Sequence, residues 1–316
     1  MGKLHKIISR IKKNPRSILL YINATGCLNF LSDKSVLKMI WWAKTGEKLN
    51  LENPGTFNEK LQWLKIYNHN PLLAELVDKY KVRGYIKETL DESYLIPLID
   101  SWEKPEEIDF SKLPDQFVLK CNHNAAIGLC ICRDKATLNA ESVRRELKKG
   151  LGNNFYFSSR EWAYKNVKRR IICEKYMEDG TGKGLRDYKF FCFGGVAKFV
   201  YISEGLENHD TASISFYDLE GEEMPFHRSD YKQFAKKPEL PVNFTEMIDA
   251  ANTLARSLVN RISLPFVRID LYSIDGKTYF SEITCYPNSG YIPFTPEEWD
   301  RKIGEWIDLS LLKGKQ

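Results

Sequence analysis

The sequence has no long hydrophobic run, no internal repeat and no low-complexity segment. No apolar stretch approaches the roughly 20 residues that a membrane-spanning helix needs, and no secretory signal is recognisable at its start. With 43% hydrophobic residues, the chain of 316 residues can bury a sizeable core in one large or two to three smaller lobes. These features indicate a globular protein and argue against a fibrous or membrane-spanning one.

The cysteines lack the pattern expected of a disulfide-bonded secreted protein. There are seven of them, an odd number, and no CxxC pair, which favours free thiols and a reducing, cytoplasmic location. Cys121, His123, Cys130 and Cys132 lie close together in the sequence, but their spacing matches no usual zinc motif. We therefore expect core thiols rather than a zinc site.

Acidic residues are missing from the N-terminal arm, residues 1–44, until Asp33, whereas six Lys and Arg residues precede that position. The net charge of +5 comes from this arm, because the chain from Asp33 onwards carries 41 basic and 42 acidic residues. Apolar residues from Ile7 to Leu20 share the arm. It is therefore either a basic amphipathic helix for the inner membrane surface or an ordinary solvated helix. Nucleic-acid binding is disfavoured, since the basic charge does not continue.

Helical and strand patterns alternate in blocks along the rest of the chain. Residues 45–115 are expected to be mainly helical, with a capping box formed by Thr56 and Glu59. From Phe117 the pattern changes to short strands, interrupted by helices near 136–150 and 245–260, and the second helix has an apolar face suited to a sheet. The sequence thus predicts an α+β protein with mainly antiparallel strands.

Charges interrupt an apolar strand pair in FVRIDLYSIDGKTYFSEITCYPNSG, residues 266–290. Successive side chains of a strand point to opposite faces, so Arg268 and Asp270 share one face. A three-residue loop ending at Gly276 would set Glu282 opposite Arg268, on that same face, with Thr284 beside it. Two converging carboxylates suit Mg²⁺ and a neighbouring arginine suits phosphate; a surface ion pair is the plainer alternative.

Three further segments have chemistry of their own. In FVLKCNHNAAIGLCIC, Lys120 ends a strand before a loop of small residues, which suits either an anion or a simple hairpin turn. IICEKYMEDG is an apolar strand that runs into an acidic turn and could present its backbone to an adenine edge. LRDYKFFCFGGVAKFVYISEG is a glycine hairpin whose Lys189 and Lys198 are either phosphate ligands or solvated charges.

Taken together and in this order, these segments resemble the ATP-grasp superfamily, and more closely its TupA-like branch, which is associated with teichuronopeptide and surface-polysaccharide biosynthesis. The phrases that carry the resemblance span roughly residues 45–305; they are TFNEKLQWLKIY, LVDKYKVRGYI, FVLKCNH, REWAYKN, LRDYKFFCFGG, FVRIDLY and FTPEEWD. The resemblance implies two α+β lobes that clamp ATP, at residues 116–180 and 181–316.

The resemblance also assigns roles to individual residues. Arg268 would lie beside the transferred phosphate, with Lys189 or Lys198 reaching the phosphates. The metal ligands would be Asp270, Glu282 and Thr284. The first lobe would bind the nucleotide through a phosphate lysine, a flap and an adenine hinge, namely Lys120, His123, Asn124, Ala125, Ala126, Gly128, Glu174, Lys175, Tyr176 and Met177, with Asp179 or Glu178 as the ribose contact.

The activity implied by the resemblance is carboxylate–amine ligation driven by ATP and Mg²⁺, through an acyl phosphate. The expected substrates are an amino acid and a uronic acid of a surface glycan or its precursor. Two alternatives remain: a nucleotide-binding partner in glycan assembly that has lost turnover, and a glycosyltransferase that uses an acidic metal motif. The Lys-strand, hinge and Arg-x-Asp order favours ATP over a nucleotide sugar.

Overall fold

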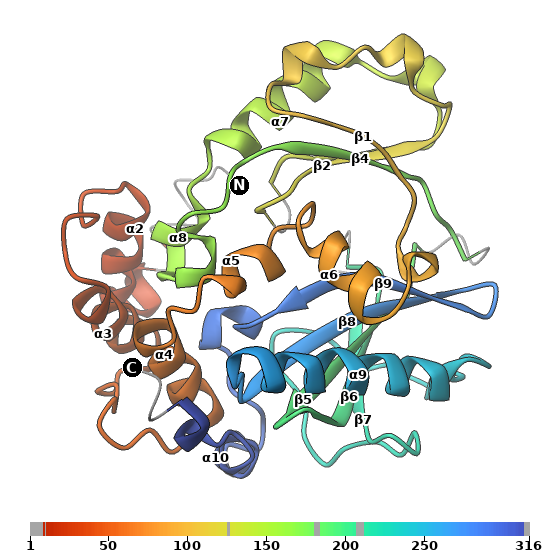
Figure 1. Ribbon diagram of the computed structural model, residues 1–316. Coiled ribbons are helices and arrows are strands. Elements are labelled where there is room, and N and C mark those ends of the chain that lie inside the picture. Colours follow the sequence, from red (N-terminus) through yellow and green to blue (C-terminus); the bar gives the residue numbers. More distant parts are fainter. Residues whose placement is uncertain (1–8, 10, 125–126, 180–183, 207–211, 313–316) are drawn as a thin grey trace.

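Two antiparallel sheets, one above the other in Figure 1, form the frame of the molecule. The structure is a computed structural model that describes residues 9, 11–124, 127–179, 184–206 and 212–312. Ala125, Ala126 and most of the first ten residues of the basic arm therefore lie outside the described residues. The mixture of sheets and helices confirms the predicted α+β class.

The helices have the following bounds: α2 Ile18–Ala24, α3 Asp33–Thr45, α4 Phe57–Tyr67, α5 Leu72–Leu76, α6 Val82–Thr89, α7 Ala140–Gly152, α8 Phe155–Ser159, α9 Phe244–Ile262 and α10 Glu298–Glu305. The strands are β1 Leu98–Trp102, β2 Phe117–Cys121, β3 Leu129–Cys132, β4 Ile171–Lys175, β5 Asp187–Phe193, β6 Val196–Glu204, β7 Ser213–Tyr217, β8 Phe266–Ile274 and β9 Lys277–Thr284.

Helix α4 begins where the sequence predicts. The Thr56 side chain accepts a hydrogen bond from the Glu59 backbone N–H, and the Glu59 carboxylate accepts one from the Thr56 backbone N–H. This capping box satisfies two N–H groups that a helix start leaves unpaired. The predicted start of α4 is thereby confirmed.

The smaller sheet has the strand order β1-β4-β2-β3, and α7 lies on its outer face (Figure 1). Alternate residues of β2, Phe117 and Leu119, face α7 and pack with Val143 and Leu147. Strand β1 is a short strand within the region 45–115, which is predicted to be mainly helical and which contains α4, α5 and α6. The strand is short and two of its five side chains are exposed, which leaves little apolar alternation to recognise.

The larger sheet has the strand order β7-β6-β5-β8-β9. Helix α9 covers one face, and its buried residues Met247, Ala251, Leu254 and Leu258 repeat at helical spacing, as predicted. The helix ends at Ser263, which has the left-handed conformation common at helix ends.

The opposite face of this larger sheet changes character along its strands. At one end, Phe191 of β5 stacks on Phe199 of β6 with ring centroids 4.6 Å apart, and Phe57 of α4 covers them. Full burial of each such ring stabilises the fold by about 1.5–3 kcal/mol. Two residues earlier on β5, Lys189 is buried among carboxylates. The aromatic end anchors the N-terminal helices, and the charged end faces the smaller sheet.

Helices α5 and α6 lie between the two sheets in Figure 1. Tyr85 of α6 donates a hydrogen bond to the Leu254 carbonyl of α9 at 2.9 Å, which ties α6 to the larger sheet. Arg83 of the same helix reaches the smaller sheet at Glu174. The segment before β1 is therefore part of the interior between the sheets, and it contributes charges to both.

Candidate active site

The strand pair β8–β9 is joined by a two-residue turn, not by the predicted three-residue loop. Ile274 pairs with Lys277, and Asp275 and Gly276 both have positive φ, as a type I′ turn requires. A β-bulge at Ser281 then shifts the register, so that Glu282 lies opposite Asp270 and Thr284 opposite Arg268. The predicted pairing of Glu282 with Arg268 is wrong, but the bulge leaves all four side chains on one face.

Asp270 lies at the centre of this face and is fully buried. Its two oxygens accept hydrogen bonds from Arg268 Nε and Nη2 at 2.7 and 2.6 Å. Lys189 Nζ lies 3.2 Å from Asp270 Oδ2 and 2.9 Å from Asp187 Oδ1. Burial alone would lower the pKa of Lys189, but Asp187 and Asp270 outweigh burial and raise that pKa above its usual value. Both cations therefore stay charged inside the protein.

Glu282 completes the cluster from β9. Its carboxylate pairs with Lys79 Nζ at 3.1 Å and with Arg268 Nη2 at 3.5 Å. Burial would raise the pKa of Glu282, but Lys79, Arg268 and Lys189 together hold it below its usual range. The side chain keeps 33% of its surface accessible, whereas that of Asp270 keeps none. Glu282 is thus the ionised carboxylate of this face that an incoming ligand can reach.

The oxygen atoms around Arg268 Nη2 provide a test of whether the face suits a metal ion. This one nitrogen lies 2.6 Å from Asp270, 3.5 Å from Glu282 and 3.0 Å from Thr284. A positively charged atom is therefore already surrounded by the three side chains that the sequence predicts as metal ligands. Oxygen donors of this kind suit Mg²⁺. Within the described residues, no group of three or more His, Cys, Asp or Glu side chains is placed to hold a metal ion.

The smaller sheet presents a second charged group toward the interior. Lys120 of β2 and Glu174 of β4 share a face and form an ion pair of 2.6 Å, while Arg83 Nη1 reaches the other Glu174 oxygen at 3.4 Å. Burial would lower the pKa of Arg83, and Glu174 acts in the opposite direction but does not fully offset it. Two cations and one carboxylate leave a net positive group, which suits a polyphosphate.

The loop after β2 is fastened to the end of α7 by its side chains. His123 Nε2 lies 3.1 Å from the Asn153 carbonyl oxygen, and Asn124 Nδ2 donates to the Gly150 carbonyl at 2.7 Å. Burial lowers the pKa of His123, which favours its neutral form. Gly128 has φ +74° and lies so close to Gly150 that a Cβ atom would clash. The side chains of His123 and Asn124 thus face the helix.

The predicted adenine hinge lies at the end of β4. The Lys175 N–H donates to the Pro97 carbonyl at 2.9 Å, so it is occupied by the start of β1. The Lys175 side chain is exposed, and Tyr176, Met177 and Asp179 are half-buried. The Tyr176 hydroxyl accepts a hydrogen bond from Arg133 Nε at 3.1 Å. The segment leaves the sheet as predicted, while its adenine role stays a prediction.

The two lysines left open by the sequence have different surroundings. Lys189 is buried in the carboxylate cluster, whereas Lys198 stands at a β-bulge of β6 with an exposed side chain. The charged end of the sheet therefore includes Lys189 and not Lys198.

Lys79, Arg83 and Asp187 belong to these charged groups but were not among the predicted site residues. Lys79 spans both sheets: its N–H donates to the Asn122 carbonyl beside the loop after β2, and its ammonium pairs with Glu282. Lys79 and Arg83 are four residues apart in LVDKYKVRGYI, a spacing that puts both on one side of a helical segment. That spacing is the sequence signal from which Lys79 and Arg83 could have been predicted as site residues.

The molecule thus has two antiparallel sheets with charged inner faces, and Lys79 bridges them. This is an ATP-grasp architecture. The chain belongs to the TupA-like ATP-grasp family, whose family model matches residues 59–308. A search of curated proteins found no match.

Solved structures with a similar fold include three ligases. D-Alanine–D-alanine ligase from Bacillus anthracis complexed with ATP has 17% identity and a TM-score of 0.44, over 83% of this chain and 77% of that one. L-amino acid ligase from Bacillus licheniformis has 14% identity and a TM-score of 0.41, over 74% of this chain and 49% of that one. The ATP-grasp ligase PsnB with its minimal precursor, Mg and ADP has 10% identity and a TM-score of 0.37, over 72% of this chain and 57% of that one. Because these TM-scores lie below 0.5, the fold assignment rests on the family match and the two sheets.

Proposed function

We propose that the protein is an ADP-forming carboxylate–amine ligase that uses ATP and Mg²⁺ in the cytoplasm. The observation that carries the proposal is the position of Lys79, which is bonded to the loop after β2 by its backbone and to Glu282 of β9 by its side chain. It links the positive group of the smaller sheet to the carboxylates of the larger one. The positive group suits a triphosphate, and the carboxylates suit a divalent cation.

The chain's own residues have distinct tasks in this reaction. Lys120 and Arg83 bind the nucleotide phosphates, and Arg268 and Lys189 stabilise negative charge on the transferred phosphoryl group. Asp270, Glu282 and the Thr284 hydroxyl fit Mg²⁺, which would neutralise phosphate charge when bound. For the metal to take this place, the Arg268 guanidinium has to turn from the carboxylates toward the phosphate.

The reaction itself consists of two transfers. A substrate carboxylate oxygen attacks the γ-phosphorus of ATP, the bond to the β,γ-bridging oxygen breaks, and ADP leaves. The amine then attacks the carbonyl carbon of the acyl phosphate, loses a proton and expels inorganic phosphate, which leaves an amide. Exclusion of water between the sheets protects the acyl phosphate from hydrolysis.

The substrates we propose are an amino acid and a uronic acid of a surface polysaccharide or its precursor. Family membership supports this choice, because the TupA-like branch is associated with such glycans. Either substrate can supply the activated carboxylate, since both carry one.

The test is Mg²⁺-dependent ADP release with uronic-acid acceptors and pooled amino acids. Asp270→Asn and Glu282→Gln are each expected to lower the rate by at least about 100-fold, because charge stabilisation at the phosphate is lost. Asp275→Asn is the matched control: this residue is exposed at the tip of the same hairpin, in a left-handed conformation that asparagine tolerates. ADP release that needs no amine, or that survives in both variants, contradicts the proposal.

We also propose that the basic arm contacts the inner membrane surface. Lys12 and Lys13 are exposed, and so are Ile18 and Ile22 of α2. Among the described residues, no helix is both long and apolar enough to cross a bilayer. Sedimentation with phosphatidylglycerol vesicles is expected to recover the protein at low salt, with a clear loss for the Lys12→Glu/Lys13→Glu variant. Equal recovery of both proteins contradicts this contact.

A further inference from the structure

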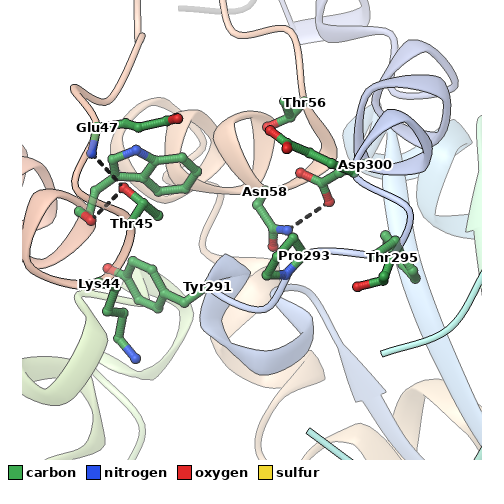
Figure 2. Close-up of a pocket in the computed structure, with 12 residues that line it drawn as sticks. Lys44, Thr45, Glu47, Thr56, Asn58, Tyr291, Pro293, Thr295 and Asp300 are labelled. Carbon is green, nitrogen blue, oxygen red and sulfur yellow. Dashed lines mark hydrogen bonds between the residues drawn. The ribbon is translucent and has the colours of Figure 1, made fainter. Parts of the chain in front are cut away.

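A cavity of about 420 Å³ lies outside the charged cluster, between the end of α3, the start of α4 and residues 291–300 (Figure 2). Figure 2 shows Lys44 and Tyr291 on one side of it and Asn58 and Asp300 on the other. A second cavity of about 280 Å³ shares Lys44 and Tyr291 with it and is also lined by Asn288 and Ser289.

Both cavities are lined by the segment that follows the β8–β9 hairpin, which carries the proposed metal ligands and is called the metal hairpin below. The short 3-10 helix Pro287–Gly290 begins three residues after Thr284, the end of β9. Lys65 donates to the Ser289 carbonyl at 2.8 Å, which fixes this segment against α4. Tyr291, which lines both cavities, thus follows the end of β9 by seven residues along the chain.

The aromatic lining of the larger cavity carries unsatisfied hydrogen-bond donors. Trp41 and Tyr291 have ring centroids 6.5 Å apart. Trp41 is only 6% exposed, and its Nε1 finds no partner among the described residues; the same is true of the buried Tyr291 hydroxyl. A buried donor without an acceptor costs about 1–3 kcal/mol. Neither atom has accessible surface, so a ligand in the cavity meets the aromatic side chains and not these donors.

The charges of the cavity disfavour an anionic ligand. Glu47, Glu297 and Asp300 line it together with one cation, Lys44, whose ammonium lies 5.0 Å from the centre of the Tyr291 ring. Asp300 is held by Asn58 Nδ2 at 2.7 Å, and burial raises its pKa to about 6. Carboxylates accept hydrogen bonds from hydroxyl groups, and their charge repels phosphates and uronates.

We propose that this cavity binds a neutral sugar unit of the glycan acceptor. A pyranose ring has an apolar C–H face for Trp41 and Tyr291 and hydroxyl groups for the carboxylates. The uronic acid would then lie toward the metal hairpin and its neutral neighbour here. This inference rests on the proposed function only in assuming that the acceptor is a glycan.

The experiment follows the indole N–H signals of the ¹⁵N-tryptophan-labelled protein during titration with neutral disaccharides, namely lactose, cellobiose and chitobiose. The Trp41 signal, assigned by its absence in Trp41→Phe, is expected to shift with at least one disaccharide. Trp41→Phe and Glu47→Gln are each expected to weaken binding about 10-fold. Trp42→Phe is the control, because Trp42 is the exposed neighbour on the same helix and does not line the cavity.

Two further probes decide between ligand classes. A Trp41 signal that responds to the diamine putrescine or to galacturonate, and to no disaccharide, overturns the proposal, as does a signal that responds to none. The titration requires no ATP, so its outcome is separate from that of ADP release. An active ligase whose Trp41 signal is silent refutes the sugar site alone, and a responding signal without ADP release refutes the ligase alone.

Discussion

The two lobes hold their candidate site residues in different ways. On the larger sheet, Arg268, Asp270 and Glu282 project from the adjacent strands β8 and β9, and Arg268 contacts both carboxylates directly. On the smaller sheet, His123 and Asn124 follow the end of a strand, and their side chains bond to the end of α7. The larger sheet therefore clusters charged side chains, whereas the smaller sheet uses side chains to hold the start of the loop after β2 against α7. Substitutions on the larger sheet should therefore affect turnover, whereas those in the loop after β2 should affect stability with little effect on turnover.

The largest combined effect on turnover and stability is expected at Lys189. Lys189→Met removes a buried cation from between Asp187 and Asp270, and breaking a buried ion pair costs about 3–5 kcal/mol of unfolding free energy. ADP release should also fall by about 100-fold or more. Lys198→Met, on the neighbouring strand, should change neither quantity. Urea unfolding and the ADP assay measure both, and equal effects of the two variants would remove the distinction drawn on the larger sheet.

The smaller sheet should be most sensitive at Gly128. In Gly128→Ala the new Cβ would lie 2.6 Å from Cys121 Sγ and 2.8 Å from Gly150 Cα, at φ +74°. We expect a loss of about 2–3 kcal/mol of unfolding free energy. Gly152→Ala is the control, because the added methyl group meets open space at the end of α7 and alanine favours helix. If Gly128→Ala is as stable as the control, the close contact between loop and helix is not maintained.

The free energy of unfolding should depend on Glu282 at acidic pH. Its pKa lies below the unfolded value of about 4.3. The stabilisation is therefore complete above that value and is lost as the pH falls through the lower folded pKa. Because a third of the side chain is accessible, we expect a contribution on the order of 1 kcal/mol. Urea unfolding between pH 6 and 2 should show a shallower decline for Glu282→Gln; parallel curves would contradict the pairing with Lys79.

The smallest effect on turnover is expected at Asn124. Asn124→Ala removes the hydrogen bonds to the Gly150 carbonyl and from Asn153 Nδ2, at a cost of about 1–2 kcal/mol. Turnover at saturating ATP should stay within about twofold, because the side chain points to α7. A large loss of turnover at unchanged stability would place this side chain at the nucleotide and erase the difference between the lobes.

Local patterns were sufficient to predict the elements that depend on nearby residues. The capping box at Thr56, the apolar face of α9 and the shared face of Arg268 and Asp270 all follow from spacings of two to four residues. The ion pair between Lys79 and Glu282 joins residues 203 positions apart, and no short pattern announces such a contact. The direction of the Asn124 side chain was likewise beyond prediction, because it depends on where α7 ends.

The bulge at Ser281 also limits how the length of this hairpin can vary in evolution. Beyond the bulge, Glu282 and Thr284 face Asp270 and Arg268, and Ile283 faces the core. Deleting Ser281 alone would remove the bulge and leave Glu282 opposite Asp270 in a regular ladder, so the faces would be kept. Adding one residue between the turn and Glu282 would instead turn the carboxylate toward the core and place Ile283 among the charges. Single-residue deletions should therefore be tolerated here in evolution, and single-residue insertions should not.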